Sequence, residues 1–280
     1  MGWTQNENNL IAENVASAKL VNIPSMVAVE DTDFYAVFVK ESVYDSATDD
    51  KYFNFTDVGG FIDPYTGETI QGLYLEPKVN LAGKVTLPTE YNGQPIVQVG
   101  GFKGSNITHV FWYGTPKVVE IYANGFAECA KLKTFEMPKS MRKIGGSAFS
   151  GCGELACPTD LGETQISQIG NYAYTGALRI NQTIPVLQLP ATLKQLGNNA
   201  FAFFLNISAG SGPVIETVNF GKPGSPSALS QVGTTPFIQN ERAIRNVNIY
   251  VSGTPDAALQ AAVATNIANN LQGTVSYPNA

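Results

Sequence analysis

The feature that most constrains the fold is an aliphatic residue followed five positions later by an aromatic residue, which recurs through the chain. Glycine or tyrosine comes directly after the aliphatic residue in every copy. The copies are Ile121 to Phe126, Ile144 to Phe149, Ile169 to Tyr174, Leu196 to Phe201 and Val232 to Phe237, with a shortened copy from Val99 to Phe102. Successive aromatic residues are 24, 23, 25, 27 and 36 positions apart. A fixed offset inside a repeat of roughly 20–30 residues is typical of a solenoid, in which each repeat forms one coil.

The clearest repeat spans residues 133–155. Its first residues alternate like a short strand, and Pro138 ends that strand because proline has no N–H to donate. Gly145 and Gly151 are expected to turn the chain on either side of Phe149, which we predict plugs the interior. The same apolar pattern recurs over residues 187–197, aligned on Pro190. Each coil therefore offers one short strand to a continuous parallel sheet, and we expect roughly six coils.

The repeated aromatic residues are predicted to form the core of this array. They are Phe102, Phe126, Phe149, Tyr174, Phe201 and Phe237. Cys129 and Cys152 each lie three residues after such an aromatic residue, so they occupy the same place in successive coils. A disulfide or a metal pair is one interpretation, and two small core side chains is the other. Ala177, at the same place in the next coil, favours core packing, and Cys157 is expected to be a reduced core thiol.

The two ends of the chain lack the repeat. We predict that residues 1–72 form a small β-rich domain that docks to other subunits, with a helix over 8–21, strands over 34–39 and 52–55, and a turn over 63–67. Residues 73–247 form the solenoid, opened by a strand over 85–88 and a tight turn at Asn92-Gly93. Residues 248–280 form a cap of strand, helix and strand. In the cap, Thr254 is the expected N-cap of a helix over 257–271 that ends at Gly273 and buries Leu259, Val263 and Ile267.

Residues 137–155 resemble the BspA-like, or Treponema-type, class of leucine-rich repeats. The positions that carry the resemblance are Met137, Pro138, Met141, Ile144, Gly145, Ala148, Phe149, Cys152 and Leu155. It extends over about residues 73–280 and loosens after Phe201, where insertions lengthen the coils. The resemblance implies a mainly β solenoid of leucine-rich-repeat-like coils with a parallel sheet and a C-terminal helical cap. Members are typically surface proteins of bacteria and protists that adhere to host or partner proteins.

Composition excludes two classes of partner. Charged residues make up 14% of the chain, the net charge is −6, and basic residues form no cluster. Nucleic-acid binding is therefore not expected, because it needs clustered lysine and arginine. No apolar stretch is long enough to insert into a membrane. The first residues lack the basic and apolar regions of a secretory signal, so we expect the chain to begin in a cytoplasm.

Catalytic, cofactor and metal sites are not expected. His109 is the sole histidine, and no nucleophile elbow accompanies it, so we predict that it lies on a strand surface. Two acidic clusters could bind calcium through carboxylate oxygens, but neither has the spacing of a calcium loop. Solvated acidic loops are the favoured interpretation. The clusters are Glu30, Asp31 and Asp33, and Asp45, Asp49 and Asp50.

Aromatic residues outside the repeat positions form the candidate interaction surface. They are Phe111, Trp112, Tyr113, Phe203 and Phe204. Such clusters dominate the energetics of many interfaces, although burial inside irregular coils is the alternative.

We therefore predict a non-enzymatic binding or structural module that is oligomeric in its context. The leading hypothesis is a structural component of a bacteriophage virion (tail, fibre or head decoration), assembled in the host cytoplasm with other protein subunits. The second is a bacterial cell-surface adhesin that binds a host surface protein or glycan. The third, less favoured, is a carbohydrate-active enzyme.

Overall fold

The computed structural model describes residues 47–64, 66–156, 158, 161–177, 183–202, 214–237, 244–268, 271 and 273–280, and the backbone of three short strands before residue 47. The chain divides into two compact units, Met1–Ser46 and Ala47–Ala280.

The first unit contains one small sheet. Strand β3 (Tyr35–Val39) pairs antiparallel with β1 (Gly2–Thr4) and parallel with β2 (Ile11–Ala12). The strand predicted over 34–39 is confirmed. The helix predicted over 8–21 is wrong at Ile11–Ala12, where pairing with β3 overrides local helix propensity. The other residues of that predicted helix lie outside the described part of the chain.

The second unit is a solenoid whose coils contribute strands to one long sheet, here called the ladder sheet. Seven strands pair in parallel with their neighbours in chain order, and β4 (Phe53–Asp57) adds an antiparallel edge on β7. The seven are β7 (Leu73–Pro77), β10 (Gln94–Val99), β12 (Glu120–Ile121), β14 (Lys143–Ile144), β15 (Gln168–Ile169), β17 (Gln195–Leu196) and β19 (Gln231–Val232). The sequence accounts for six of these coils, and β7 adds one that lacks the aromatic repeat.

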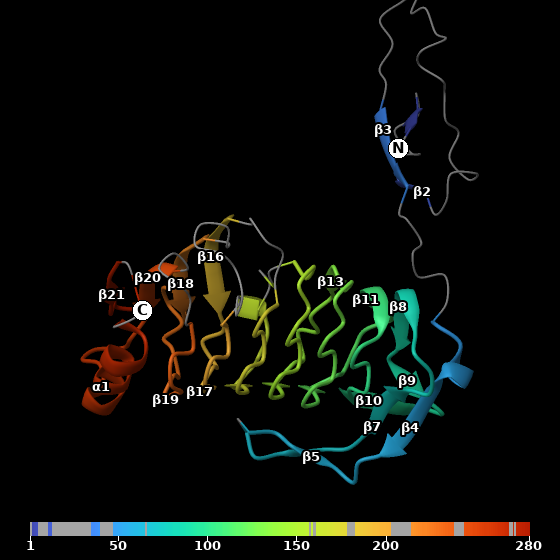
Figure 1. Ribbon diagram of the computed structural model, residues 1–280, viewed down its shortest axis with the longest axis horizontal. Helices are drawn as coiled ribbons and strands as arrows, with labels where there is room; N and C mark the ends of the chain where they lie inside the picture. The colour runs from blue at the N-terminus through green and yellow to red at the C-terminus, as the bar shows by residue number, and fades with distance from the viewer. Residues whose placement is uncertain are drawn as a thin grey trace, which may run out of the picture. The chain divides into compact units, whose positions relative to one another are not determined.

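The return arcs of the coils carry two further parallel sheets, on the opposite side from the ladder sheet (Figure 1). The first holds β8 (Ala82–Pro88), β11 (Asn106–Tyr113) and β13 (Thr134–Phe135). The second holds β16 (Thr183–Leu189), β18 (Val214–Phe220), β20 (Ile244–Ile249) and β21 (Val275–Ser276). Strand β9 (Glu90–Tyr91) turns back onto β10 through Asn92 and Gly93, whose φ angles of 50° and 75° confirm the predicted tight turn.

The repeated aromatic residues form one continuous stack through the interior. The stack runs from Phe102 to Phe237. The centroids of successive rings are 4.7, 5.7, 5.1, 5.2 and 5.6 Å apart, and the ring planes are nearly parallel. All six are at most 4% exposed. Neighbouring strands of a sheet lie about 4.8 Å apart, so a ring at a fixed place in each coil meets the next ring at stacking distance.

Left-handed residues lie close to the aromatic rings on one side or both, among the residues that the structure describes, and they make the corners of the coil. Two positions before the ring stand Asn124, Ser147, Tyr172, Asn199 and Thr235, and two positions after it stand Gly104, Glu128, Gly151 and Gly176, all with positive φ. The turn predicted at Gly151 is therefore present. The turn predicted at Gly145 is also present, because Ala148 N–H donates to the Gly145 carbonyl at 3.3 Å, and Gly145 itself packs closely against the preceding coil.

Glu128 occupies a corner where the described neighbouring coils have glycine, with φ of 59°. Because a left-handed backbone costs an L-residue about 1 kcal/mol relative to glycine, we expect Glu128→Gly to raise the free energy of unfolding by roughly 0.5–1 kcal/mol. Urea denaturation measures this change. The substitution also removes the exposed Lys103–Glu128 ion pair, so Lys103→Met is the control, with an expected change near zero. A lower stability of Glu128→Gly would contradict the strain argument.

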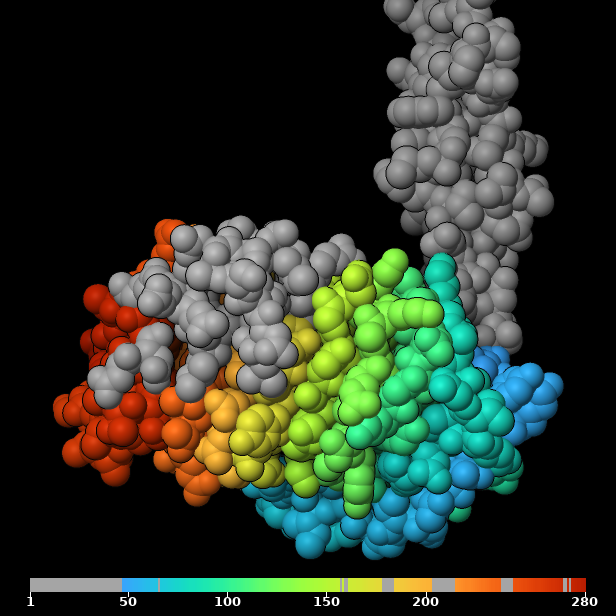
Figure 2. Space-filling model, viewed as in Figure 1, coloured from blue at the N-terminus to red at the C-terminus, as the bar shows by residue number. Residues whose placement is uncertain are grey.

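A hairpin covers the outer face of the first ladder coils. Its strands β5 (Phe61–Ile62) and β6 (Thr69–Ile70) are antiparallel and lie along the lower edge of the solenoid in Figures 1 and 2. Phe61 packs on Val97 and Val119, which point outward where later coils have Ser167, Lys194 and Ser230.

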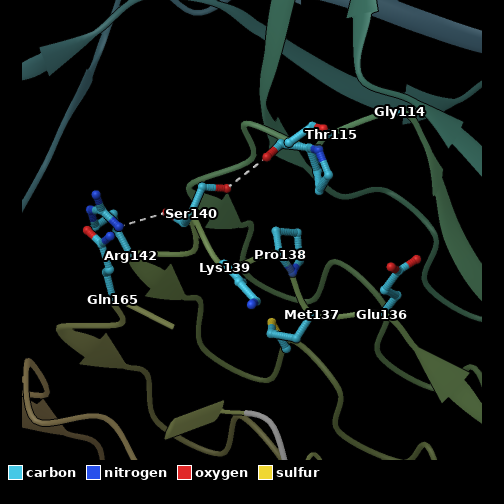
Figure 3. A pocket seen from close by; sticks show the side chains of 10 residues that line it. Gly114, Thr115, Glu136, Met137, Pro138, Lys139, Ser140, Arg142 and Gln165 are labelled. Carbon is cyan, nitrogen blue, oxygen red and sulfur yellow. Dashed lines mark hydrogen bonds between the residues drawn. The ribbon is translucent and has the colours of Figure 1, made fainter. Parts of the chain in front are cut away.

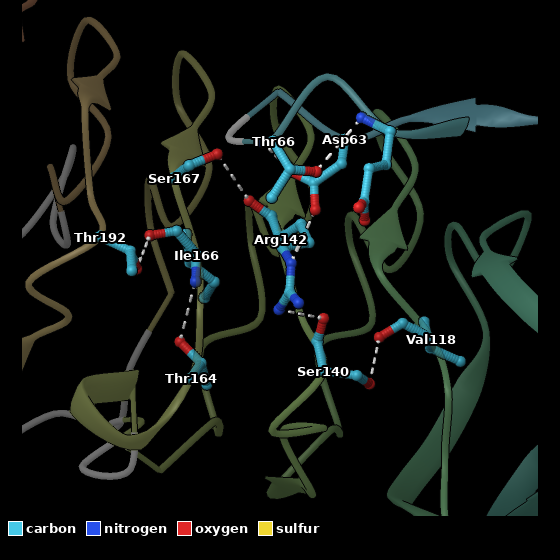
Figure 4. A network of polar contacts seen from close by, with 10 residues as sticks. Asp63, Thr66, Val118, Ser140, Arg142, Thr164, Ile166, Ser167 and Thr192 are labelled. Atoms are coloured by element: carbon cyan, nitrogen blue, oxygen red, sulfur yellow. Dashed lines mark hydrogen bonds and ion pairs between the residues drawn. The ribbon is translucent and has the colours of Figure 1, made fainter. Parts of the chain in front are cut away.

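A buried ion pair holds the tip of the hairpin. Asp63 is 2% exposed and accepts a hydrogen bond from Arg142 Nε at 2.9 Å (Figure 4). The predicted turn at 63–67 is confirmed by Gly67 N–H donating to the Asp63 carbonyl. These contacts and the β4–β7 pairing tie residues 47–72 to the coils, which explains why the compact unit begins at Ala47 and not at the predicted boundary of 72.

The helix α1 (Ala257–Asn266) closes the C-terminal end. Its predicted buried face is confirmed, because Leu259, Val263 and Ile267 are all in the core. The N-cap is Asp256 and not Thr254: the Asp256 carboxylate accepts from Leu259 N–H at 2.9 Å. The helix ends before Gly273, which instead lies directly against the Arg245 backbone.

Candidate interaction surface

Strand β11 presents alternate side chains to the interior and to solvent. Val110 and Trp112 point inward, with Trp112 4% exposed. The Trp112 indole donates from Nε1 to the Glu136 carbonyl at 2.8 Å and meets Phe135 edge-on. Trp112 is therefore not part of the interaction surface predicted from the sequence, because strand alternation places it in the core.

Phe111 and Tyr113 lie on the outer side of β11 together with His109, and we call these three residues the β11 stripe. Tyr113 is 49% exposed, and the rings of His109 and Phe111 stack with centroids 5.8 Å apart. The alternation of inward and outward side chains along β11 is shifted by a bulge between Ile107 and His109, where β11 pairs with β8. Phe203 and Phe204 lie outside the described residues.

His109 begins the stripe, and its surroundings determine the charge of its ring. Partial burial lowers the pKa of His109, and the positive charges of Lys84 and Lys133 lower it further. Its Nδ1 lies 2.9 Å from Thr108 Oγ1. The ring is therefore neutral near pH 7 and adds an uncharged aromatic surface to the stripe.

A groove of about 640 Å³ begins where β11 and β13 end (Figure 3). Its lining comes from three successive coils: residues 114–116, residues 136–140 with Arg142, and Gln165. Figure 3 shows Arg142 and Glu136 on opposite sides of the groove. Arg142 is fixed by Asp63 and by donation from Nη1 to the Ser140 carbonyl at 3.0 Å, and Ser140 Oγ donates to the Val118 carbonyl at 2.7 Å (Figure 4). The stripe and the groove together are called the β11 face.

The two repeat cysteines are free thiols in the core. Cys129 Sγ donates to the Phe102 carbonyl and Cys152 Sγ to the Phe126 carbonyl, each at 3.0 Å. Each thiol thus bonds to the preceding coil, at the carbonyl of its aromatic residue. Cys157 lies outside the described residues.

Burial raises the pKa of the Cys129 thiol from 9.0 to about 11, and burial also raises that of Cys152. We expect both to resist alkylation by iodoacetamide at pH 8 in the native protein and to react after unfolding in urea, as mass spectrometry of the peptides would show. The folded state holds the thiol proton of Cys129 more tightly than the unfolded state does. The resulting contribution to the free energy of unfolding is complete below pH 9.0 and is lost as the pH rises toward 11. A double Cys129→Ala, Cys152→Ala variant should lose less stability over that interval, and rapid native labelling would contradict the burial.

The acidic clusters predicted from the sequence are only partly within the described residues. Asp49 accepts from the Lys51 N–H and pairs with its ammonium at 2.7 Å, at the start of a 3-10 turn over Asp50–Tyr52. Glu30, Asp31, Asp33 and Asp45 lie outside. Within the described part of the chain, no group of three or more metal-ligating side chains comes together. Nor does any helix there have the length and apolar character needed to span a membrane.

Comparison with known proteins identifies the repeats. A family model described as "BspA type Leucine rich repeat region" matches residues 96–213 in six copies. No curated protein matches the chain.

Two solved structures resemble the chain at low identity. One is a leucine-rich repeat protein of Treponema pallidum, with 18% identity, coverage of 84% of this chain and 100% of that one, and a TM-score of 0.39. The other is a leucine-rich cell surface protein of Faecalibacterium prausnitzii, with 18% identity, coverage of 72% of this chain and 54% of that one, and a TM-score of 0.46. The family match over residues 96–213 agrees with the ladder and the aromatic stack, and this part of the chain is a BspA-type leucine-rich repeat region.

Proposed function

We propose that this chain is a non-enzymatic protein-binding module whose contact surface is the β11 face. The observation that carries the proposal is the outward placement of Phe111 and Tyr113 directly before a groove of about 640 Å³. Aromatic anchors next to a depression are the usual centre of a protein interface. The mixed charges of Glu136, Lys139 and Arg142 provide a polar rim for such a contact.

The chemistry of the groove supports binding over catalysis. Among the described residues that line it, Glu136 is the one carboxylate, whereas glycoside cleavage uses a pair. His109 lies on the stripe and is not among the described residues that line the groove. The lining thus offers shape, an aromatic edge and fixed polar groups.

Two biological settings follow from this proposal. In the first, the chain is a structural component of a bacteriophage virion, attached through residues 1–46 and presenting the solenoid. In the second, it is a bacterial cell-surface adhesin that uses the same face on a host or partner protein. The division of the chain into two compact units, Met1–Ser46 and Ala47–Ala280, supports separate roles in attachment and presentation in both settings.

The test of the binding face is a paired substitution in the full chain. A partner is first identified by cross-linking in the native particle or cell, and its affinity is then measured for Phe111→Ser with Tyr113→Ser. We expect a loss of at least about tenfold, or 1.4 kcal/mol. Tyr52→Ser is the matched control, because Tyr52 is also an exposed tyrosine, at 37%, and lies outside the β11 face. Equal affinities for both variants would overturn the proposal.

Deletion of residues 1–46 tests whether this unit attaches the chain while the solenoid binds the partner. We expect it to abolish incorporation into the particle or retention at the cell surface while partner binding persists. Deletion to residue 72 would also remove the hairpin and expose Val97 and Val119, so it cannot serve as this test.

A further inference from the structure

A second surface, on the corner that follows the ladder sheet, carries an ordered set of neutral polar and aromatic side chains. The corner segments are residues 122–125, 145–148, 170–173, 197–200 and 233–236, stacked by backbone hydrogen bonds such as Tyr172 N–H to the Asn198 carbonyl at 2.8 Å. We call their outer surface the amide corner. It does not include any residue of the β11 face.

Two asparagine side chains in the amide corner are oriented by the next coil. Asn171 Oδ1 accepts from Asn198 N–H at 2.8 Å, and Asn198 Oδ1 accepts from Thr234 N–H at 2.7 Å. In an asparagine side chain only the oxygen can accept a hydrogen bond from a backbone N–H. The Nδ2 groups of Asn171 and Asn198 must therefore point away from these hydrogen bonds. Within the part of the chain that the structure describes, neither Nδ2 has a protein partner. Two fixed N–H₂ donors are thus held one coil apart, about 4.8 Å along the stack.

Exposed tyrosine rings accompany these donors. Tyr172 is 46% exposed and Tyr122 is 48% exposed, two coils away, where it packs against Tyr74 with ring centroids 5.3 Å apart. Tyr172 has φ of 59°, and the residues at its position in the other coils are Asn124, Ser147, Asn199 and Thr235. Asparagine tolerates this left-handed backbone and tyrosine does not, so the fold itself gives no reason for a tyrosine here.

Glutamines form a parallel row on the other side of the corner. Gln168, Gln195 and Gln231 are in register on β15, β17 and β19, and the last two are exposed. Between this row and residues 171, 198 and 234 the chain carries glycine, at 170, 197 and 233, where the coils approach one another too closely for a side chain. Residues 167–172, 195–199 and 230–235 contain no Asp, Glu, Lys or Arg.

We propose that the amide corner binds a neutral oligosaccharide. Each carboxamide both donates and accepts, which matches hydroxyl groups, and the faces of Tyr122 and Tyr172 suit the C–H faces of sugar rings. The rows repeat at the coil spacing, so successive sugar units meet equivalent groups. These segments carry no charge, and Lys143 and Glu120, which continue the glutamine row toward Tyr122, pair with each other at 2.8 Å, so a neutral ligand is favoured. Because Asn171 and Asn198 are fixed by the fold, their donors lose little freedom on binding.

Two substitutions separate binding from folding. Tyr172→Asn removes the ring but places a residue suited to the left-handed corner, so we expect affinity to fall while the thermal midpoint holds or rises. Asn171→Asp keeps the oxygen that accepts from Asn198 N–H and replaces the Nδ2 donor by a second oxygen. A purely structural role for either residue would not reduce binding in a protein of unchanged stability.

The measurement is calorimetric titration of the full chain with cellohexaose, chitohexaose and maltohexaose. We expect at least one of them to bind, and Tyr172→Asn and Asn171→Asp each to lose about tenfold in affinity. Tyr113→Ala, on the β11 face, should bind as the unmodified chain does, so failure here and failure of the proposed protein-binding function are distinguishable. The proposal is overturned if none of the three saccharides binds, or if both corner variants retain full affinity.

Discussion

Truncation of Phe149 to alanine is expected to lower the free energy of unfolding by about 3–5 kcal/mol. Phe149 is fully buried in the middle of the aromatic stack. Its ring stacks on Phe126 at 5.7 Å and on Tyr174 at 5.1 Å, and meets Phe135 edge-on at 5.1 Å. The cavity cannot close by a small shift, because the coils on both sides are held by backbone hydrogen bonds such as Phe149 N–H to the Ala173 carbonyl at 2.8 Å. Urea denaturation followed by circular dichroism measures the loss.

Tyr113→Ala is the matched control for this truncation. It also removes an aromatic ring, but one that is 49% exposed on the β11 stripe, so the expected change is within about 0.5 kcal/mol. A denaturation midpoint for Phe149→Ala equal to that of the control would show that the stack does not hold the coils together.

The sequence was most informative where the structure is local and periodic. The offset from Ile144 to Phe149 lies within one coil, and repetition of the coil converts it into a stack and a ladder. The alternation of β11 likewise could have shown that Trp112 and Tyr113 face opposite sides. It did not settle which side, because the bulge after Ile107 shifts the pattern.

Features that depend on distant contacts were not predictable in this way. The Asp63–Arg142 pair joins residues 79 positions apart, and nothing in residues 57–72 repeats. The apolar Val97 and Val119, at positions where later coils have polar residues, were the one signal that something covers the first ladder coils. The orientation of the Asn171 and Asn198 amides was also out of reach, since it depends on hydrogen bonds between coils.

Substitution of Gly170 by alanine is expected to destabilise the protein by about 3 kcal/mol, the upper end of the range for overpacking. A Cβ at this position would lie 2.5 Å from the Gly146 nitrogen and 2.8 Å from the Gly145 carbonyl carbon. Both are backbone atoms of the preceding coil, so no side-chain rotation can make room. The coils would have to separate locally, which would weaken the ladder pairing between β14 and β15 and the contact between Phe149 and Tyr174.

Gly153→Ala isolates this effect from the general consequences of replacing glycine. A Cβ at Gly153 would meet no atom within 4 Å, and its φ is not in the left-handed region. Alanine there restricts the unfolded chain without a clash, so the expected change is between zero and a gain of about 1 kcal/mol. If both variants unfold at the same urea concentration, close approach of the coils is not why glycine follows the aliphatic residue. If only Gly170→Ala loses stability, close spacing of the coils explains why glycine follows the aliphatic residue. Tyr122 occupies the equivalent place in its own coil, so that coil is the one that accommodates a large outward side chain there.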